Sequence, residues 1–225
     1  MKERKKTAAR TRAKEAPPPA KAHAGGGPRE RIMEAAFAVL MEKGYAGAST
    51  LEIATRARVS KRELYTLFGD KRGILVEMIA SRAARMHQAL NLPPATDHSG
   101  LAETLIAFGT TVLVEVCHPI VVTMFRVAIS ESDRPAELAH VLDENGRGAH
   151  RRALIAFLGP MVRAGLLGDA DPETVASQFL SLLFGDTLLR VVMRAIDPPS
   201  QRDCARRAQT ATAAVLQLYR PVSRT

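Results

Sequence analysis

A short stretch in the N-terminal third of the chain places cations and hydroxyls on one side of a predicted helix. Counting from Ser60, the outward positions of this helix are Lys61, Arg62, Tyr65 and Thr66. Lysine and arginine donate hydrogen bonds to phosphates and guanine edges, and tyrosine and threonine reach phosphates or a thymine methyl. The chemistry open to these residue types is therefore recognition of a DNA duplex.

Two helices must position these side chains, and each has its own start signal. Ser49 with Glu52 fits the capping-box pattern, in which the serine hydroxyl and the glutamate carboxylate each bond a free backbone amide. The same spacing recurs at Ser60 and Glu63. The apolar positions that face one another across the turn are Ile53, Ala57, Val59, Leu64 and Leu67. Two short helices with facing stripes and a tight turn are typical of a helix-turn-helix.

A helical hairpin with a solvated charged face would show some of the same signals, but their combination favours DNA binding. The predicted DNA-contacting set also includes Ser49, Thr50, Arg58, Ser60 and Lys71. Arg58 stands in the turn where glycine is common. A left-handed backbone there costs about 1 kcal/mol for a non-glycine residue. Contact with a phosphate would offset this cost, and another turn conformation would avoid it.

The flanking helices carry matching signals. Residues 29–43 place apolar side chains at helical spacing, and Gly44 follows as a natural end residue. Asp70 is placed to cap a long helix that runs to about Leu90. Lys71 lies in the first turn of that helix, where a cation opposes the helix dipole unless a phosphate binds at the same place.

Charge is distributed unevenly along the chain. Residues 1–28 hold eight Lys and Arg against two Glu, and residues 29–75 hold nine cations against six acids. Residues 76–225 hold equal numbers of each sign, so the net charge of +9 lies entirely in the N-terminal third. A basic end joined to a neutral body is the electrostatic footprint of a DNA-binding protein.

Further residues of the segment 29–79 follow a known pattern. They are Glu42-Lys43-Gly44-Tyr45, Ile53-Ala54, Val59-Ser60-Lys61, Leu64-Tyr65, Phe68, Lys71 and Leu75. On these residues the segment resembles the N-terminal domain of the TetR family of transcriptional regulators. The resemblance implies phosphate contacts from Lys61, Tyr65 and Lys71, and a helical, ligand-binding C-terminal domain. The departures from the family pattern are Arg58, Arg62-Glu63 and Gly69.

The first 28 residues are predicted to be a disordered basic tail, because they lack the apolar side chains that could offset the entropy of ordering. The tail either adds sequence-independent DNA affinity or serves only as a solubilising leader. We expect no membrane-spanning helix, since no run of about 18 apolar residues is present. Cys117 and Cys204 are expected to be free and buried, which favours a reducing, cytoplasmic location.

Signals for catalysis are missing from the sequence. It contains no Gly-x-Ser-x-Gly, His-Glu-x-x-His or Cys-x-x-Cys motif. The six histidines have no spacing typical of zinc ligands. We therefore expect no catalytic residue, no metal and no cofactor.

The remainder of the chain predicts an all-α fold, divided into the DNA-binding domain at 29–75 and a ligand-binding and dimerisation domain at 76–225. Proline and glycine divide the second domain into helices at about 100–118, 119–132, 135–165, 171–195 and 200–220, with a possible break near Gly146 and Gly148. Residues 124–194 also loosely resemble the AefR-like C-terminal subgroup, through Phe125-Arg126-Val127 and Phe184-Gly185-Asp186.

The helix predicted at 171–195 is apolar on two opposite sides, so both sides must be covered. One side can face the domain's own core, and a second subunit is the simplest cover for the other. The family resemblance implies the same homodimer, built from the last two helices. The residues predicted at this interface are Val175, Phe179, Leu182, Leu189, Met193, Leu216 and Tyr219. A monomer with a larger core is the alternative.

A ligand pocket is predicted among the helices of residues 80–165. Its candidate lining residues are Phe108, Thr111, Met124 and Phe157, with Glu115 or Arg126 as polar anchors. Such a composition suits an apolar effector, but it equally describes an ordinary core. The expected function is a ligand-responsive repressor released from a palindromic operator. The alternatives are an all-α enzyme or carrier that uses the C-terminal pocket, and an architectural protein held on DNA by its tail.

Overall fold

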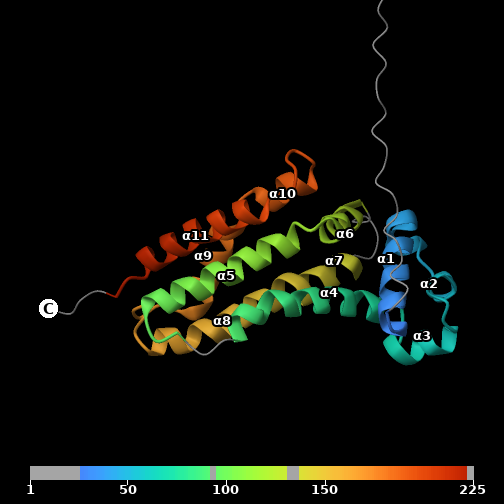
Figure 1. Ribbon diagram of the computed structural model, residues 1–225, viewed down its shortest axis with the longest axis horizontal. Coiled ribbons are helices and arrows are strands. Elements are labelled where there is room, and N and C mark those ends of the chain that lie inside the picture. Colours follow the sequence, from blue (N-terminus) through green and yellow to red (C-terminus); the bar gives the residue numbers. More distant parts are fainter. Residues whose placement is uncertain (1–25, 92–94, 131–136, 222–225) are drawn as a thin grey trace, which may run out of the picture.

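The computed structural model describes residues 26–91, 95–130 and 137–221 (Figure 1). All regular secondary structure assigned within these residues is helical. This confirms the predicted all-α class. Three helices form a unit at one end of the molecule: α1 (Pro28–Gly47), α2 (Thr50–Ala57) and α3 (Lys61–Phe68). Apart from its last three residues, the predicted basic tail lies outside the described residues.

The helices of the C-terminal part lie roughly along one another. They are α4 (Lys71–His87), α5 (His98–Val116), α6 (Pro119–Ser130), α7 (Glu137–Leu142), α8 (Gly148–Arg163), α9 (Pro172–Phe184), α10 (Thr187–Val192) and α11 (Gln201–Leu218). A short 3₁₀ helix, Gln88–Asn91, continues α4. A π-helical turn, Asp143–Arg147, joins α7 to α8, so the predicted break near Gly146 and Gly148 is a change of helix type. Helices α11 and α9 pack along one side of α5, and α4 packs along another.

The N-terminal unit has its own core, which fixes the orientation of α2 and α3. Ile32 and Val39 of α1 are fully buried together with Ile53 of α2 and Leu64 of α3. The helical stripe predicted for residues 29–43 is therefore the buried one. Gly44 adopts a positive φ of 71°, which bends the end of α1 and leads the chain toward α2.

Helix α4 connects this unit to the rest of the molecule. Ile74 belongs to the N-terminal core, and Leu75 and Ile79 join a second cluster with Met124 of α6. Met86, one residue before the end of α4, lies in the large C-terminal core. Helix α4 thus contributes to three clusters and links the C-terminal part to the N-terminal unit.

By length and composition, α5 is apolar enough to cross a membrane, but it lies in the core of the protein, in keeping with the expectation that no helix spans a membrane. Its position shows why it is apolar. Leu101, Leu105, Phe108 and Val112 are completely or almost completely buried in the C-terminal core, against α9 and α11. Helix α5 is the central core helix of this domain.

The prediction of a single helix at 171–195 was wrong, because two helices occupy this range. Helix α9 ends at Phe184, and Gly185 adopts φ 46° and ψ −125°, a conformation that side chains disfavour. Arg207 of α11 donates to the carbonyl oxygens of Leu183 and Phe184, at 2.5 and 3.1 Å. These bonds satisfy the free end of α9, and the chain turns before α10 begins.

Candidate nucleic-acid interface

The two serine caps of the helix-turn-helix are present. Ser49 Oγ accepts from the amide of Glu52 at 3.2 Å, and Ser60 Oγ accepts from the amide of Glu63 at 3.0 Å. The glutamate half of each capping box was predicted wrongly. The Glu52 carboxylate instead pairs with Lys43 and Arg56, at 2.8 and 2.7 Å. Among the described residues, the Glu63 carboxylate has no hydrogen-bond or ion-pair partner.

The turn between α2 and α3 is built around Arg58. This residue is left-handed, with φ 54° and ψ 46°, and the amide of Val59 donates back to the carbonyl of Ala54 at 3.0 Å. This bond closes the end of α2 in the manner of a Schellman motif, in which the left-handed residue is usually glycine. Of the two conformations open to the sequence, the strained one is observed, at a cost of about 1 kcal/mol.

Three of the predicted DNA-contacting residues meet on one face. The hydroxyls of Thr50 and Tyr65 share a hydrogen bond of 3.2 Å, which joins α2 to α3. The ammonium of Lys61 lies 5.6 Å from the centre of the Tyr65 ring, which is itself exposed. The structure therefore groups a hydroxyl, an aromatic ring and a cation at the beginning of α3.

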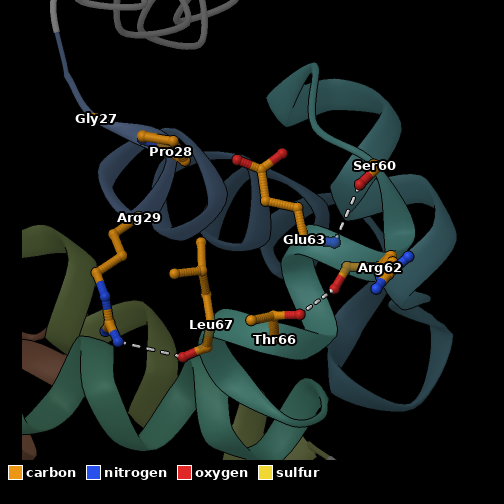
Figure 2. Close-up of a pocket in the computed structure, with 8 residues that line it drawn as sticks. All are labelled: Gly27, Pro28, Arg29, Ser60, Arg62, Glu63, Thr66 and Leu67. Carbon is orange, nitrogen blue, oxygen red and sulfur yellow. Dashed lines mark hydrogen bonds between the residues drawn. The ribbon is translucent and has the colours of Figure 1, made fainter.

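The other outward residues of α3 border a groove of about 590 Å³. Its lining comes from the start of α1 and from α3: Gly27, Pro28, Arg29, Ser60, Arg62, Glu63, Thr66 and Leu67 (Figure 2). The Glu63 side chain extends toward Pro28, whereas Arg62 extends away from α1. Thr66 Oγ1 donates to the carbonyl of Arg62 at 2.9 Å and keeps its acceptor capacity. Sequence reasoning missed the α1 side of this groove, because periodicity does not report which residues face α3.

Most cations of the N-terminal unit are engaged within the protein. The engaged pairs are Arg29 with Glu77, Lys43 with Glu52, Arg56 with Glu42 and Glu52, and Arg72 with Glu144. The hydrogen bond from Arg56 lowers the pKa of the Glu42 carboxyl below its ordinary value. Within the described residues, the side chains of Arg58, Lys61 and Arg62 have no acidic partner. Exposed cations without an acidic partner thus lie at the turn and at the start of α3, whereas Arg31 and Lys71 bond backbone carbonyls.

Lys71 differs from this group. Its ammonium donates to the carbonyl of Tyr45 at 2.7 Å and lies 4.2 Å from the centre of the Tyr45 ring. These contacts hold Lys71 against the end of α1. A phosphate contact from Lys71 stays a prediction, and it would use one of the two remaining N–H donors.

The residues predicted to line a ligand pocket are not gathered around one cavity. Phe108 is fully buried and stacked near Phe179, and Phe157 packs partly buried against the same core. Met124 lies in a separate cluster with α4 and α7. The Thr111 hydroxyl donates to the carbonyl of Ala107 in its own helix.

Both predicted polar anchors are engaged within the protein. Glu115 pairs with Arg82 at 2.8 Å and with Arg85 at 3.2 Å, which ties α5 to α4. Arg126 donates to the carbonyls of Val191 and Val192, each at 2.8 Å, and closes the end of α10. In this conformation neither side chain is free to anchor a ligand.

The residues predicted at a dimer interface fall into three groups. Val175 and Phe179 are fully buried in the chain's own core, so their assignment to an interface was wrong. Leu216 and Tyr219 are partly buried against that core, and the Tyr219 hydroxyl donates to Gln178 at 2.8 Å. The exposed group is Leu182, Leu189 and Met193, with 46%, 59% and 68% of the side chain accessible, joined by Leu218, which was not predicted.

Two family models match this chain. Residues 32–78 match the N-terminal model of the bacterial regulatory proteins of the tetR family. Residues 103–221, more than half of the chain, match the C-terminal domain of AefR-like transcriptional repressors. The chain belongs to the TetR family. It is therefore a DNA-binding transcriptional regulator, which confirms both sequence resemblances and the prediction that the chain is not an enzyme.

Relatives of this TetR-family protein span nearly its whole helical part. An uncharacterised HTH-type transcriptional regulator of Bacillus subtilis, YvkB, is 25% identical over 175 residues, which make up 77% of this chain and 89% of the relative. A TetR regulator from Agrobacterium tumefaciens is 27% identical with a TM-score of 0.69, and the match covers 86% and 95% of the two chains. The flavonoid-responsive regulator FrrA is 29% identical with a TM-score of 0.66, covering 85% and 96%.

Within the described residues, no group of three or more His, Cys, Asp or Glu side chains is placed to hold a metal ion. Cys117 and Cys204 are both free and buried. Burial raises the pKa of the Cys117 thiol to about 11, so this thiol is protonated at neutral pH and a poor nucleophile.

Proposed function

We propose that this TetR-family regulator is a cytoplasmic homodimer that represses transcription from a pseudo-palindromic operator and is released by a small apolar effector. The observation that carries the proposal is the concentration of unpaired cations, Arg58, Lys61 and Arg62, beside the exposed Tyr65 at the start of α3. A recognition helix enters the major groove with its N-terminal residues toward the bases. Lys61 and Arg62, two of the cations without an acidic partner, are the first two residues of α3.

The proposed dimer interface is the exposed apolar surface of Leu182, Leu189, Met193 and Leu218 on α9, α10 and α11. Large apolar side chains left exposed to solvent are candidates for burial at an interface. Two-fold pairing through it would present two copies of α3. A spacing of about 34–36 Å between them, one turn of DNA, would suit two half-sites of a palindrome.

The proposed release mechanism passes through α4. The carboxylate of Glu115 on α5 joins Arg82 and Arg85 of α4, while the first turns of α4 pack in the N-terminal core. An effector that binds more tightly to a different packing of α4 on α5 would change the separation of the two recognition helices. The loss of operator affinity would equal the effector's preference for that packing.

The effector site in this proposal opens between α5 and α8, beside Phe108 and Phe157. The apolar side chains of that region suit a hydrophobic compound. FrrA is described as flavonoid-responsive, which favours planar aromatic compounds as the first class to test. The AefR-like repressor match supports repression as the direction of regulation.

Selection of bound duplexes from a random pool at physiological salt tests the proposal. We expect one inverted repeat to be enriched, and a reporter with that repeat over its promoter to be silenced. Adding the correct aromatic effector should restore transcription. Equal recovery of all duplexes would contradict the proposal and would favour an architectural protein, whose affinity is independent of sequence.

A further inference from the structure

The outward face of α3 is centred on three polar side chains. Leu64 and Phe68 are the buried residues of this helix and mark its core side. Because successive residues of an α-helix are turned by about 100°, Arg62, Glu63 and Thr66 point furthest from that side. All three border the groove between α3 and the start of α1 (Figure 2). When this face enters a major groove, the same three side chains approach the base edges.

Glu63 is the unexpected member of this face, because its carboxylate has no counter-charge. Figure 2 shows it extending toward the start of α1, whereas Arg62 extends in the other direction. Arg29, the cation on the α1 side of the groove, pairs with Glu77 and donates to the carbonyl of Leu67 at 3.3 Å. Within the part of the chain that the structure describes, neither of the two cations that line the groove pairs with Glu63.

An unpaired carboxylate on a DNA-facing surface repels the phosphates and discriminates among the bases. It carries the same charge as the duplex, and it accepts hydrogen bonds but cannot donate one. Of the four bases, cytosine alone presents only a donor, its exocyclic amine, in the major groove. Adenine adds the N7 acceptor beside its amine, and guanine and thymine present acceptors. A carboxylate at this place therefore favours cytosine and disfavours the other three bases.

Resting on the proposed function, we propose that Glu63 is a specificity-determining residue that accepts a hydrogen bond from the exocyclic amine of one cytosine in each operator half-site. The guanine paired with this cytosine presents two acceptors, O6 and N7, which suit the guanidinium of the neighbouring Arg62. Only where cytosine is present does the new hydrogen bond offset the repulsion between the carboxylate and the phosphates. Glu63 thus rejects other sequences as well as stabilising the correct one.

Base-by-base variation of the operator tests this role. Selection from a random pool first identifies the inverted repeat, and each position of one half-site is then changed to the other three bases. The intact protein is compared with Glu63→Gln and Glu63→Ala. Glu34→Gln is the matched control, since Glu34 is exposed on α1 and the change removes the same charge from the same unit. Dimer mass and thermal unfolding verify that all four proteins share one folded state.

The intact protein should prefer cytosine over each other base by about tenfold at one position of the half-site. Glu63→Gln should reduce this preference to less than about threefold, because an amide donates as well as accepts and can therefore bond the acceptors of other bases. The same variant should bind random duplexes more tightly, since it lacks the charge that repels phosphates. Glu34→Gln should keep the full preference for cytosine.

Removal of the amine alone tests the hydrogen bond itself. A cytosine analogue that lacks only the exocyclic amine should weaken binding of the intact protein by about tenfold and leave binding of Glu63→Ala unchanged. Equal losses in these two proteins would overturn the inference, as would a cytosine preference that survives in Glu63→Ala. An enriched repeat with no position that requires cytosine would also overturn it and would leave the proposed function standing. Failure to enrich any inverted repeat would instead contradict the proposed function.

Discussion

The hydroxyl of Tyr65 is the most direct test of the recognition surface, because it bonds Thr50 while the ammonium of Lys61 lies over the same tyrosine ring. Tyr65→Phe removes only this oxygen. We expect operator affinity to fall by about 0.5–1.5 kcal/mol, the usual net value of one hydrogen bond. Fluorescence anisotropy with a labelled operator measures the loss.

Tyr219→Phe is the matched control, since Tyr219 also donates one hydroxyl bond but lies on the C-terminal domain. It should leave DNA affinity unchanged. Comparable loss in both variants, or loss of the dimer in Tyr65→Phe, would mean that the hydroxyl of Tyr65 is structural.

Arg58 combines strain with an unpaired charge, so its replacement should separate stability from binding. Arg58→Gly relieves the left-handed backbone and should raise the free energy of unfolding by about 1 kcal/mol. The same change should lower DNA affinity and reduce the salt slope by about one per half-site, if the guanidinium contacts a phosphate. Urea unfolding and salt-dependent binding measure the two effects. A more stable variant with an unchanged salt slope would show that Arg58 makes no phosphate contact.

At the residue scale, the sequence predicted which side chains of α3 point outward, because a helical period and a serine cap determine the facing. It did not predict that Lys71 would bond the carbonyl of Tyr45 or that Glu52 would turn to Lys43. Those partners come from other helices, and no local pattern encodes them. The same reason explains why Glu115 and Arg126 were placed in a pocket.

A polar contact between His87 of α4 and His150 of α8 joins these two helices, and we expect it to respond to pH. His87 Nε2 and His150 Nδ1 lie 3.3 Å apart, and His150 is almost completely buried. Burial, with a smaller effect of His87, lowers the pKa of His150 to about 4, and burial also lowers the pKa of His87. The folded protein therefore holds both rings neutral.

Because these folded-state pKa values lie below the unfolded value near 6.5, stability is complete above that pH and is lost as the pH falls toward 4. For His150 alone, each unit by which the pH falls within this window lowers the free energy of unfolding by about 1.4 kcal/mol. Urea midpoints at pH 7.5 and 5.5 measure the slope. His150→Gln should flatten it, whereas His140→Gln, on the exposed side of α7, should not. Equal slopes in all three proteins would contradict this account.

The break between α9 and α10 should depend on Gly185. A side chain there would meet the guanidinium of Arg207 and would force a conformation that only glycine tolerates. Gly185→Ala should lower the free energy of unfolding by about 1–3 kcal/mol. Gly159→Ala, inside α8, should instead raise it by up to about 1 kcal/mol through helix propensity. Denaturant unfolding of both variants measures the difference, and a stabilised Gly185→Ala would show that the break is not enforced.

At the element scale, the sequence predicted most helices, because apolar periodicity and proline or glycine signals mark their starts and ends. It missed the break at Gly185 because the apolar pattern continues across it and the bonds from Arg207 come from another helix. Two-sided apolarity did indicate burial on both sides. The apolar pattern did not show which side faces the core: Val175 and Phe179 do, whereas Leu182 faces outward.

For the whole molecule, the exposed apolar surface should control assembly and thereby DNA binding. Leu189→Glu places a charge within the proposed interface and should give a monomer with weak operator affinity. Ile129→Glu is a close control, since Ile129 on α6 is 60% exposed and Leu189 is 59% exposed. Light scattering after gel filtration measures the mass. A Leu189→Glu dimer, or two monomeric variants, would place the interface elsewhere.

The core position of α5 has a consequence for how the protein is made. Its main cover, α11, is synthesised only after the intervening residues 117–200. The helix-turn-helix depends on nearby partners and can fold early, whereas the C-terminal domain must wait for a distant one. Until then, each nascent chain carries a helix as apolar as a membrane span without its main cover. Chains that stop before Ser200 are thus expected to become clients of chaperones and proteases rather than partially active regulators.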